Sequence, residues 1–215
     1  MQQPGGLTDN QYKQAPRQST RNRNWFNINW NIPSVKLEYQ PKETIRWNTA
    51  LFGLIGARSA LGFLSYANRN DDFKERDLIK DNYKNFGLES RFLYQYKLGK
   101  NQSSLSVGLR YFRGFTTKQQ GLGNTENTAD FDYLNPTDLE NSDYHFIGNN
   151  LALSAENIFK ITPKLSITPG IRMEVLFTNV NGYYKSDSIR YTDDRNYKRI
   201  FPLLGIGISY KAHEL

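Results

Sequence analysis

Apolar and polar residues alternate with a period of two along residues 86–96. One set of alternate positions holds Phe86, Leu88, Ser90, Phe92, Tyr94 and Tyr96, and the other holds Gly87, Glu89, Arg91, Leu93 and Gln95. This period predicts a β-strand, because successive side chains of a strand point to opposite faces of a sheet. One face of the strand requires an apolar environment, which is either a protein core or a membrane.

The same alternation recurs along the chain and predicts seven strands and no helix. The predicted strands cover residues 26–39, 45–64, 86–96, 105–112, 150–161, 165–177 and 204–211. In the first of them the apolar positions shift by one residue at Pro33. A proline together with a one-residue shift predicts a β-bulge at that point.

Short and long connections are expected to alternate between these strands. Tight turns are predicted near residues 41–44, 98–102 and 162–164, and polar loops at residues 1–22, 66–82, 117–143 and 184–198. Outer-membrane barrels have short turns at one end and long loops at the other. A sandwich or a propeller has no reason to gather its long loops at one end. The sequence therefore predicts an all-β fold, an antiparallel up-and-down transmembrane β-barrel segment of about seven long strands.

Aromatic residues on the apolar face sort by their expected height in such a barrel. The group near the short turns contains Tyr39, Trp47, Tyr94, Tyr96, Phe159 and Tyr210, and the group near the long loops contains Phe26, Phe86, Tyr111 and Phe177. Two girdles of this kind are expected where rings lie at lipid headgroups.

The polar face would then line the barrel lumen. It carries charged residues on four predicted strands: Glu89, Arg91, Arg110, Glu156, Arg172 and Glu174. Acids and bases alternate between neighbouring strands, so cross-strand ion pairs are expected. We predict that this layer faces an internal plug and lies opposite the face of Phe92 and Leu109.

Composition narrows the class of protein. Aromatic residues make up 14% of the chain although its mean hydropathy is −0.70, which favours rings displayed on a surface over a compact aliphatic core. No apolar run is long enough for a transmembrane helix, and the absence of cysteine excludes disulfides and thiolate metal sites. The net charge of +7 indicates a solvated basic surface or an anionic partner, such as an anionic ligand, lipid phosphates or nucleic acid.

The seven predicted strands are an incomplete barrel. A sheet in a membrane cannot keep open edges, and bacterial single-chain barrels have even strand numbers. The N-terminus also has no signal peptide pattern, since it has neither a basic nor an apolar region. We therefore expect residues 1–215 to be an internal piece of a larger barrel.

Several short motifs, taken in order, resemble those of the TonB-dependent outer-membrane receptors, and most closely the ferric dicitrate transporter type. They are Gln3-Pro-Gly-Gly-Leu-Thr-Asp9, Pro16-Arg-Gln-Ser-Thr-Arg21, Asn24-Trp-Phe26, Leu51-Phe-Gly-Leu54, Val107-Gly-Leu-Arg-Tyr-Phe112 with Gln119-Gln120, Leu134-Asn-Pro136, Ala155-Glu-Asn157 and Ile167-Thr-Pro-Gly-Ile-Arg172. The resemblance extends over nearly the whole chain.

The resemblance implies a barrel of about 22 strands with an N-terminal plug and a TonB box. Such a receptor lies in the outer membrane of a Gram-negative bacterium and imports a ferric chelate, such as ferric citrate or a siderophore. Residues 1–215 would be a partial barrel domain without the plug, through which the whole receptor would contact the TonB complex. Outer-membrane lipid or lipopolysaccharide is a further expected partner, nucleic acid is not, and no cofactor is implied beyond the transported Fe(III) chelate.

Ferric citrate and most siderophore complexes are anionic, and arginine binds carboxylates in a bidentate manner. Arg17, Arg21 and Arg23 cluster before the first strand at the expected outer mouth, and Arg113, Gln119 and Gln120 lie where the fourth strand enters its loop. These are the candidate ligand-binding residues, with exposed loop charges and contacts to lipopolysaccharide phosphate as the alternative interpretation of each.

Enzymatic activity is not expected. His145 and His213 are far apart in the sequence and suggest neither a metal pair nor a catalytic triad, so we predict no catalytic and no metal site. Two other functions remain open at this point: a structural or adhesive outer-membrane barrel without a plug, and a soluble all-β carbohydrate-binding module.

Overall fold

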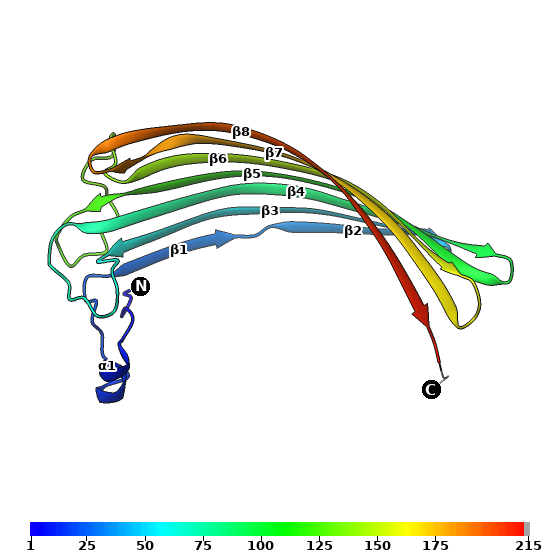
Figure 1. Ribbon diagram of the computed structural model, residues 1–215, viewed down its shortest axis with the longest axis horizontal. Helices are drawn as coiled ribbons and strands as arrows, with labels where there is room; N and C mark the ends of the chain where they lie inside the picture. The colour runs from blue at the N-terminus through cyan, green and yellow to red at the C-terminus, as the bar shows by residue number, and fades with distance from the viewer. Residues whose placement is uncertain (213–215) are drawn as a thin grey trace.

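The computed structural model describes residues 1–212, which form one curved antiparallel sheet and one short helix (Figure 1). The elements are α1 (Asp9–Gln14), β1 (Trp25–Asn31), β2 (Ser34–Lys42), β3 (Ile45–Gly62), β4 (Arg76–Leu98), β5 (Asn101–Gly123), β6 (Ser142–Lys160), β7 (Leu165–Ser186) and β8 (Ile189–Tyr210). His213 lies outside the described residues.

The sheet has up-and-down topology, with the order β1-β3-β4-β5-β6-β7-β8 and with β2 also paired to β3. β1 and β2 together form the first predicted strand, so the structure has the seven expected passes across the sheet. The predicted all-β, antiparallel up-and-down fold class is confirmed. Within residues 1–212, no helix is long and apolar enough to cross a membrane.

The three predicted tight turns lie together at one end of the sheet, and we call it the short-turn end (right in Figure 1). The opposite end, the long-loop end, carries the loops 63–75 and 124–141 and the segment before β1. Both loops are shorter than predicted, because β4 begins at Arg76 and β5 continues to Gly123.

The predicted loop at residues 184–198 is wrong, because this segment is a hairpin. β7 and β8 stay paired up to Ser186 and Ile189, and Asp187 and Ser188 turn the chain with φ angles of 51° and 64°. Tyr184 and Tyr191 face each other across the hairpin with ring centroids 5.0 Å apart. The sequence did not predict this hairpin, because its strands are polar on one face and only partly apolar on the other and so lack a clear apolar alternation.

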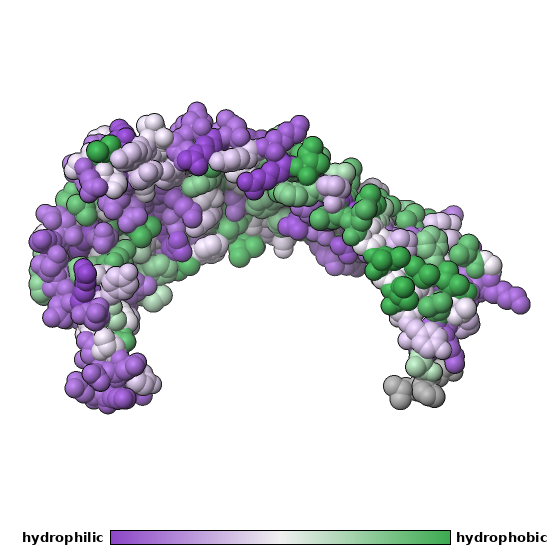
Figure 2. Space-filling view, viewed as in Figure 1, coloured by the Kyte–Doolittle hydropathy of each residue, from purple (hydrophilic) through white to green (hydrophobic). Residues whose placement is uncertain are grey.

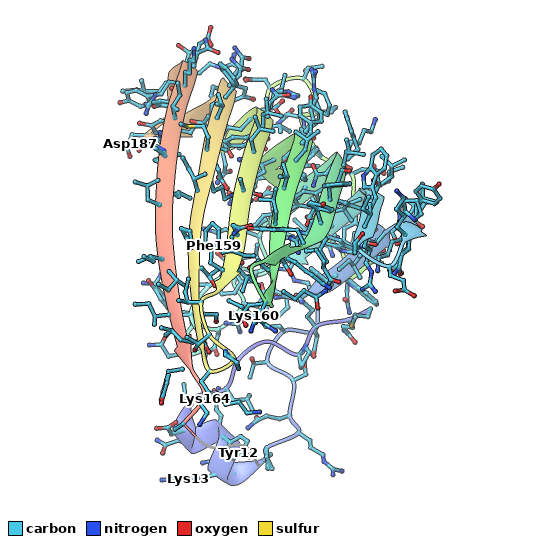
Figure 3. The ribbon with its side chains drawn as sticks, turned by 90° about the vertical axis from the view of Figure 1, so that its right-hand side faces the viewer. Tyr12, Lys13, Phe159, Lys160, Lys164 and Asp187 are labelled. Carbon is cyan, nitrogen blue, oxygen red and sulfur yellow. The ribbon has the colours of Figure 1, made fainter. Side chains whose placement is uncertain are left out.

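The predicted loop at residues 1–22 contains helix α1, which lies below the sheet with Tyr12 and Lys13 on it (Figure 3). A capping box starts the helix: the Gln11 backbone N–H donates to the Thr8 hydroxyl, and the Thr8 N–H donates to Gln11 Oε1 at 2.8 Å. The sequence Thr8-Asp-Asn-Gln11 carries this signal. The prediction of no helix was therefore wrong.

The predicted bulge at Pro33 is also wrong. Asn31 lies opposite Ile55 and Ser34 lies opposite Phe52, so the register against β3 is the same before and after the proline. The register shifts instead between Tyr39 and Lys42, beside Pro41. Without a bulge at Pro33, the shift of the apolar positions takes them to the other face of the sheet.

The register defines two faces. We call the face that carries Phe92 and Leu109 the belt face, and the face that carries Glu89 and Arg110 the charged face. Toward the short-turn end the belt face is apolar and exposed on every pass, with Val35, Leu37, Tyr39, Trp47, Leu51, Phe92, Val107, Leu151, Leu153, Ile171, Met173, Leu204, Ile206 and Ile208. Figure 2 shows hydrophobic residues concentrated toward this end and hydrophilic ones over the long-loop end.

Phe26 is the exception among the residues predicted for the aromatic girdles. It lies opposite Ala60, which in turn lies opposite Ile79, and this row belongs to the charged face. The other residues named for the two girdles lie on the belt face. Phe26 therefore belongs to a different surface near the long loops.

Replacing Gly62 with alanine is expected to lower the free energy of unfolding by roughly 1–3 kcal/mol. Gly62 has a φ of 153°, and an added Cβ would lie 2.2 Å from Oδ1 of the buried Asn24. Gly148→Ala is the matched control, since nothing lies within 4 Å of a Cβ there. Denaturant unfolding compares the two variants, and equal losses of stability would contradict the expectation.

Candidate ligand-facing surface

The six charged residues predicted for the polar face share the charged face, opposite to Phe92 and Leu109. Glu89 lies across from Arg110, Arg110 from Ala152, and Ala152 from Glu174. Arg91, Arg172 and Glu156 lie in the next two rows toward the short turns. We call these six residues the charged layer.

The ion pairs of the charged layer run along strands and not between them. Arg91 Nη2 lies 3.4 Å from Glu89 Oε1, and Arg172 Nε donates to Glu174 Oε1 at 2.6 Å. Asn150 also donates to Glu174 at 3.4 Å. In the described residues no ion pair joins Glu89 to Arg110 although they lie opposite each other, so the expected cross-strand pairing was wrong. Residues two apart on one strand share a face, which allows these pairs.

Small residues hollow out the sheet between these charges. A cavity of about 460 Å³ is lined by charged side chains and by small residues, among them Arg91, Glu156, Arg172, Ser106, Ser154, Gly170 and Gly205. A second cavity, of about 140 Å³, lies between Glu89, Arg110 and Gly108. The charged layer therefore forms a polar recess with paired charges at its edge.

Nearer the long loops, the charged face changes character and carries aromatic pairs. Trp30 and Tyr83 stack with centroids 5.5 Å apart, Tyr144 and Phe146 lie 5.8 Å apart, and Tyr184 stacks on Tyr191. The register places all of them on the charged face. We call these six residues the aromatic tier.

Charged groups are interspersed in the aromatic tier. Arg58 donates from Nε to Asp81 Oδ2 at 3.0 Å, and the Tyr83 hydroxyl donates to the same oxygen at 3.2 Å. Lys118 lies opposite both Asp81 and Tyr144. This surface offers rings for stacking and cations for an anionic group. Sequence reasoning missed it because five of its six rings lie outside the predicted strands, although the apolar alternation of Phe26, Ile28 and Trp30 was a signal for it.

Arg21 and Arg23 bind the segment before β1 to the loops at the long-loop end. The Arg21 guanidinium donates to the carbonyls of Tyr66 at 2.9 Å and Arg69 at 2.8 Å. Arg23 Nη2 lies 2.5 Å from Asp71 Oδ1, and Arg23 Nη1 donates to the carbonyl of Thr125 at 2.7 Å. Hydrogen bonding to Arg23 lowers the pKa of Asp71 below its ordinary value.

Arg76 extends the same network to the loop 124–141. Its side chain is fully buried and donates to the carbonyls of Asn124 at 2.9 Å and Thr128 at 2.7 Å. Burial lowers the pKa of its guanidinium. We call Arg21, Arg23 and Arg76 the arginine clip, because together they join three segments that are distant in the sequence.

The residues predicted to bind a ligand do not come together on one surface. Arg17 is exposed. Arg21 and Arg23 are only 3% and 5% exposed, and their guanidinium groups already bind the loop carbonyls and Asp71 as members of the arginine clip. Arg113 and Gln119 lie on the belt face, with Arg113 over the Phe115 ring and Gln119 bonded to Asp143 at 3.2 Å. Gln120 alone lies on the charged face, opposite Ile79. Among residues 1–212, no group of three His, Cys, Asp or Glu side chains could hold a metal ion.

Solved structures of iron-uptake proteins share this fold. The chain is similar to the ferric citrate transporter FecA in its unliganded form, with 20% identity and a TM-score of 0.74 over 98% of this chain and 29% of that one. It is also similar to the ferric yersiniabactin uptake receptor FyuA from Yersinia pestis (9% identity, TM-score 0.66, 89% of this chain and 27% of that one). A third similar structure is the siderophore receptor PiuA from Acinetobacter baumannii (15% identity, TM-score 0.62, 89% and 31%).

The chain thus spans less than a third of the length of the solved chains that it matches. No protein-family model matches the sequence. No curated protein matches it either. The structural likeness shows that the sheet is a segment of the kind of β-barrel that these receptors form.

Replacing Arg23 with leucine should open the long-loop end locally. The change leaves Asp71, whose side chain is 10% exposed, without its cation, and breaking a buried pair from one side costs roughly 3–5 kcal/mol. Hydrogen exchange of the amides in residues 63–75 and 124–128 should accelerate. Arg17→Leu, at an exposed position, is the control, and unchanged protection in the Arg23 variant would contradict the role of the clip.

The clip should also loosen in acid. The pKa of Asp71 is lowered in the folded protein. The stabilisation that the Arg23–Asp71 pair gives the folded state is therefore complete above the ordinary pKa of the carboxyl, about 3.9, and is lost as the pH falls through the lowered pKa. Pepsin cleavage within residues 63–75 should therefore increase below about pH 4. The Asp71→Asn variant, compared with the wild type at each pH, corrects for the pH dependence of pepsin itself. The ratio of wild-type to variant cleavage should rise toward one as the pH falls below about 4, and a ratio that stays constant down to about pH 2 would refute the link to Asp71.

Proposed function

We propose that this chain is a barrel segment of a TonB-dependent receptor that imports a ferric chelate across the outer membrane of a Gram-negative bacterium. The observation that carries the proposal is the structural similarity to the ferric citrate transporter over 98% of the chain. The other two solved structures described above are named as a ferric yersiniabactin uptake receptor and a siderophore receptor, which supports iron uptake as the general function.

The two faces of the sheet fit this function physically. An exposed apolar belt on every pass is stable against lipid and unstable in water, since each buried apolar Å² contributes about 25 cal/mol. In this arrangement the belt face contacts the bilayer and the charged face lines the lumen. The long-loop end then lies outside the cell and the short-turn end in the periplasm.

The aromatic tier is our proposed ligand-binding surface, in place of the arginines of the clip. It lies on the lumenal face near the outer mouth, where a chelate would enter. Arg58 and Lys118 exceed the single carboxylate of Asp81 by one positive charge beside the rings of Trp30 and Tyr83, and this combination suits an anionic ferric chelate. Ferric dicitrate is the chelate that we propose, on the basis of the sequence resemblance and the structural similarity.

The charged layer is the proposed contact for a plug. Its recess of small residues can accept a protruding segment, and its paired charges can exchange their partners for polar groups of that segment. The plug, and with it the TonB contact, would come from a part of the protein outside residues 1–215. β1, β2 and β8 are the edges of the described sheet, and further strands would pair with them in a closed barrel.

Binding of ferric citrate to the intact receptor tests the ligand surface. Trp30→Ala with Tyr83→Ala should weaken binding about tenfold or more, since an aromatic contact contributes about 0.5–1.5 kcal/mol beyond its area. Tyr94→Ala with Tyr96→Ala removes another stacked pair from the belt face and should leave binding unchanged. Titration calorimetry measures both variants.

Uptake of radioactive iron by cells with and without TonB tests the transport function. We expect uptake to require TonB. Uptake that is equal in both strains would overturn the transport proposal. If the aromatic variant and the belt-face control bind equally well while uptake still requires TonB, the receptor function stands and the aromatic tier is not the binding surface.

A further inference from the structure

Three fully buried leucines lie on the belt-face side of the sheet at its long-loop end. Leu61 and Leu78 lie opposite each other on β3 and β4, and Leu139 belongs to the loop 124–141. Gly121 lies opposite Leu78, and an added Cβ there would lie 3.2 Å from the Leu139 side chain. The missing side chain of Gly121 therefore lets this loop lie directly on the belt-face side of the sheet, beyond the apolar belt. We call residues 124–141 the strap.

Further contacts of the strap reach the same side of the sheet. Nζ of Lys80, a residue of the belt face, lies 4.9 Å from the centroid of the Tyr133 ring. The Leu134 N–H donates to the Leu122 carbonyl at 2.9 Å, and the Leu122 N–H donates to the Glu140 carboxylate at 2.8 Å. The strap therefore covers the long-loop ends of β4 and β5 from the side of the belt face.

Both ends of the strap are fixed. The arginine clip binds carbonyl groups at its start. At its end, Lys185 Nζ lies 2.7 Å from Asp138 Oδ1, and the Lys185 backbone N–H donates to the Asn141 carbonyl at 2.7 Å. The Tyr183 hydroxyl donates to the Leu139 carbonyl at 3.3 Å. The strap therefore joins the clip to the β7–β8 hairpin at the long-loop end (left in Figure 1).

The aromatic tier lies on the other face of the sheet and stays clear of the strap. In the β7–β8 hairpin, Tyr183 and Lys185 lie on the belt face and contact the strap. Tyr184 and Tyr191 of the same hairpin lie on the charged face and belong to the aromatic tier. In the described part of the chain, no hydrogen bond or ion pair joins the strap to any residue of the tier. The strap thus holds the hairpin from one face and leaves its rings on the other face uncovered.

We propose that the strap is a fixed element of the outer rim and not a lid, and that it holds the β7–β8 hairpin so that the aromatic tier stands open and preformed for the chelate. Lifting the strap would expose Leu139 to water and would take from Arg76 its carbonyl acceptors, so both ends oppose such a motion. Leu139 acts on the ligand only through the position of Tyr184 and Tyr191, which makes it a positioning residue. The inference rests on the proposed function, in which the charged face lines the lumen.

Chemical crosslinking of the strap in the intact receptor tests whether it has to move. The chain contains no cysteine, and Asp138 and Lys185 already lie in contact, so Asp138→Cys with Lys185→Cys places two thiols that a bifunctional methanethiosulfonate can join. The crosslinked receptor should take up ferric citrate within about twofold of the rate before crosslinking, because a fixed strap has no closing step. Each single-cysteine variant treated with the same reagent is the control for thiol modification. A larger loss of uptake that a reductant reverses would overturn the proposal.

Two leucines of the strap form a matched pair, since Leu139 is 1% exposed and Leu134 is 49% exposed. Leu139→Ala should raise the mobility of a spin label at position 188 in the hairpin turn and weaken the binding of ferric citrate at least about threefold, because it removes buried contacts. Leu139→Met, which nearly conserves the volume, should restore both values, and Leu134→Ala should change neither. Wild-type mobility and affinity in a folded Leu139→Ala variant, or an equal effect of Leu134→Ala, would contradict the positioning role.

These measurements separate a failure of the strap from a failure of the proposed function. The mobility of the spin label is recorded without any chelate, so it reports on the strap whether or not ferric citrate is the ligand. Uptake that does not require TonB would overturn the proposed function. Uptake that requires TonB but is lost reversibly on crosslinking would overturn the fixed strap and leave the receptor function standing. If Leu139→Ala does not fold, the crosslinking result alone decides.

Discussion

A side chain of a β-strand lies on one face of its sheet or on the other, and an unbroken register transmits this choice from strand to strand. From β3 to β8 the strands pair without any register shift over the central part of the sheet. The position of Phe92 therefore fixes the faces of Val107, Ala155 and Ile171. The apolar belt, the charged layer and the aromatic tier all follow from this constraint.

The two faces exchange their character along the length of the strands. Toward the short turns, apolar side chains lie on the belt face and charges on the opposite one. Toward the long loops, Trp30, Tyr83 and Tyr144 place rings on the charged face, whereas Lys84 and Asn82 make the belt face polar. The exchange is expected where strands leave a bilayer, because the outer wall then meets water and headgroups while the lumenal wall meets a ligand. In the first pass, formed by β1 and β2, this exchange occurs at Pro33, where the apolar positions of the sequence shift by one residue.

The sequence predicted the seven passes, the two faces and the short-turn end, since a period of two within an apolar belt is a strong signal. It did not predict the extent of β4, β5, β6, β7 and β8 beyond the belt, because strands that carry many polar residues resemble loops. Helix α1 was missed although Thr8 and Gln11 form a recognisable cap. Arg21 and Arg23 were predicted to bind a ligand at the outer mouth, and Arg76 was not singled out, because no sequence pattern shows that Arg21 and Arg23 bind carbonyl groups of segments some fifty residues away.

The central claim is that the belt face contacts lipid and the charged face lines the lumen. The chain contains no cysteine, so single cysteines can be introduced one at a time along β6 of the intact protein in vesicles. Spin labels at positions 151 and 153 should be accessible to oxygen dissolved in the bilayer and not to a water-soluble nickel complex, whereas labels at 152 and 154, on the charged face, should show no such preference for oxygen. A label at position 149, one row beyond the apolar belt toward the long loops, should again be accessible to the nickel complex. Uniform access of the nickel complex to all five positions would contradict the account.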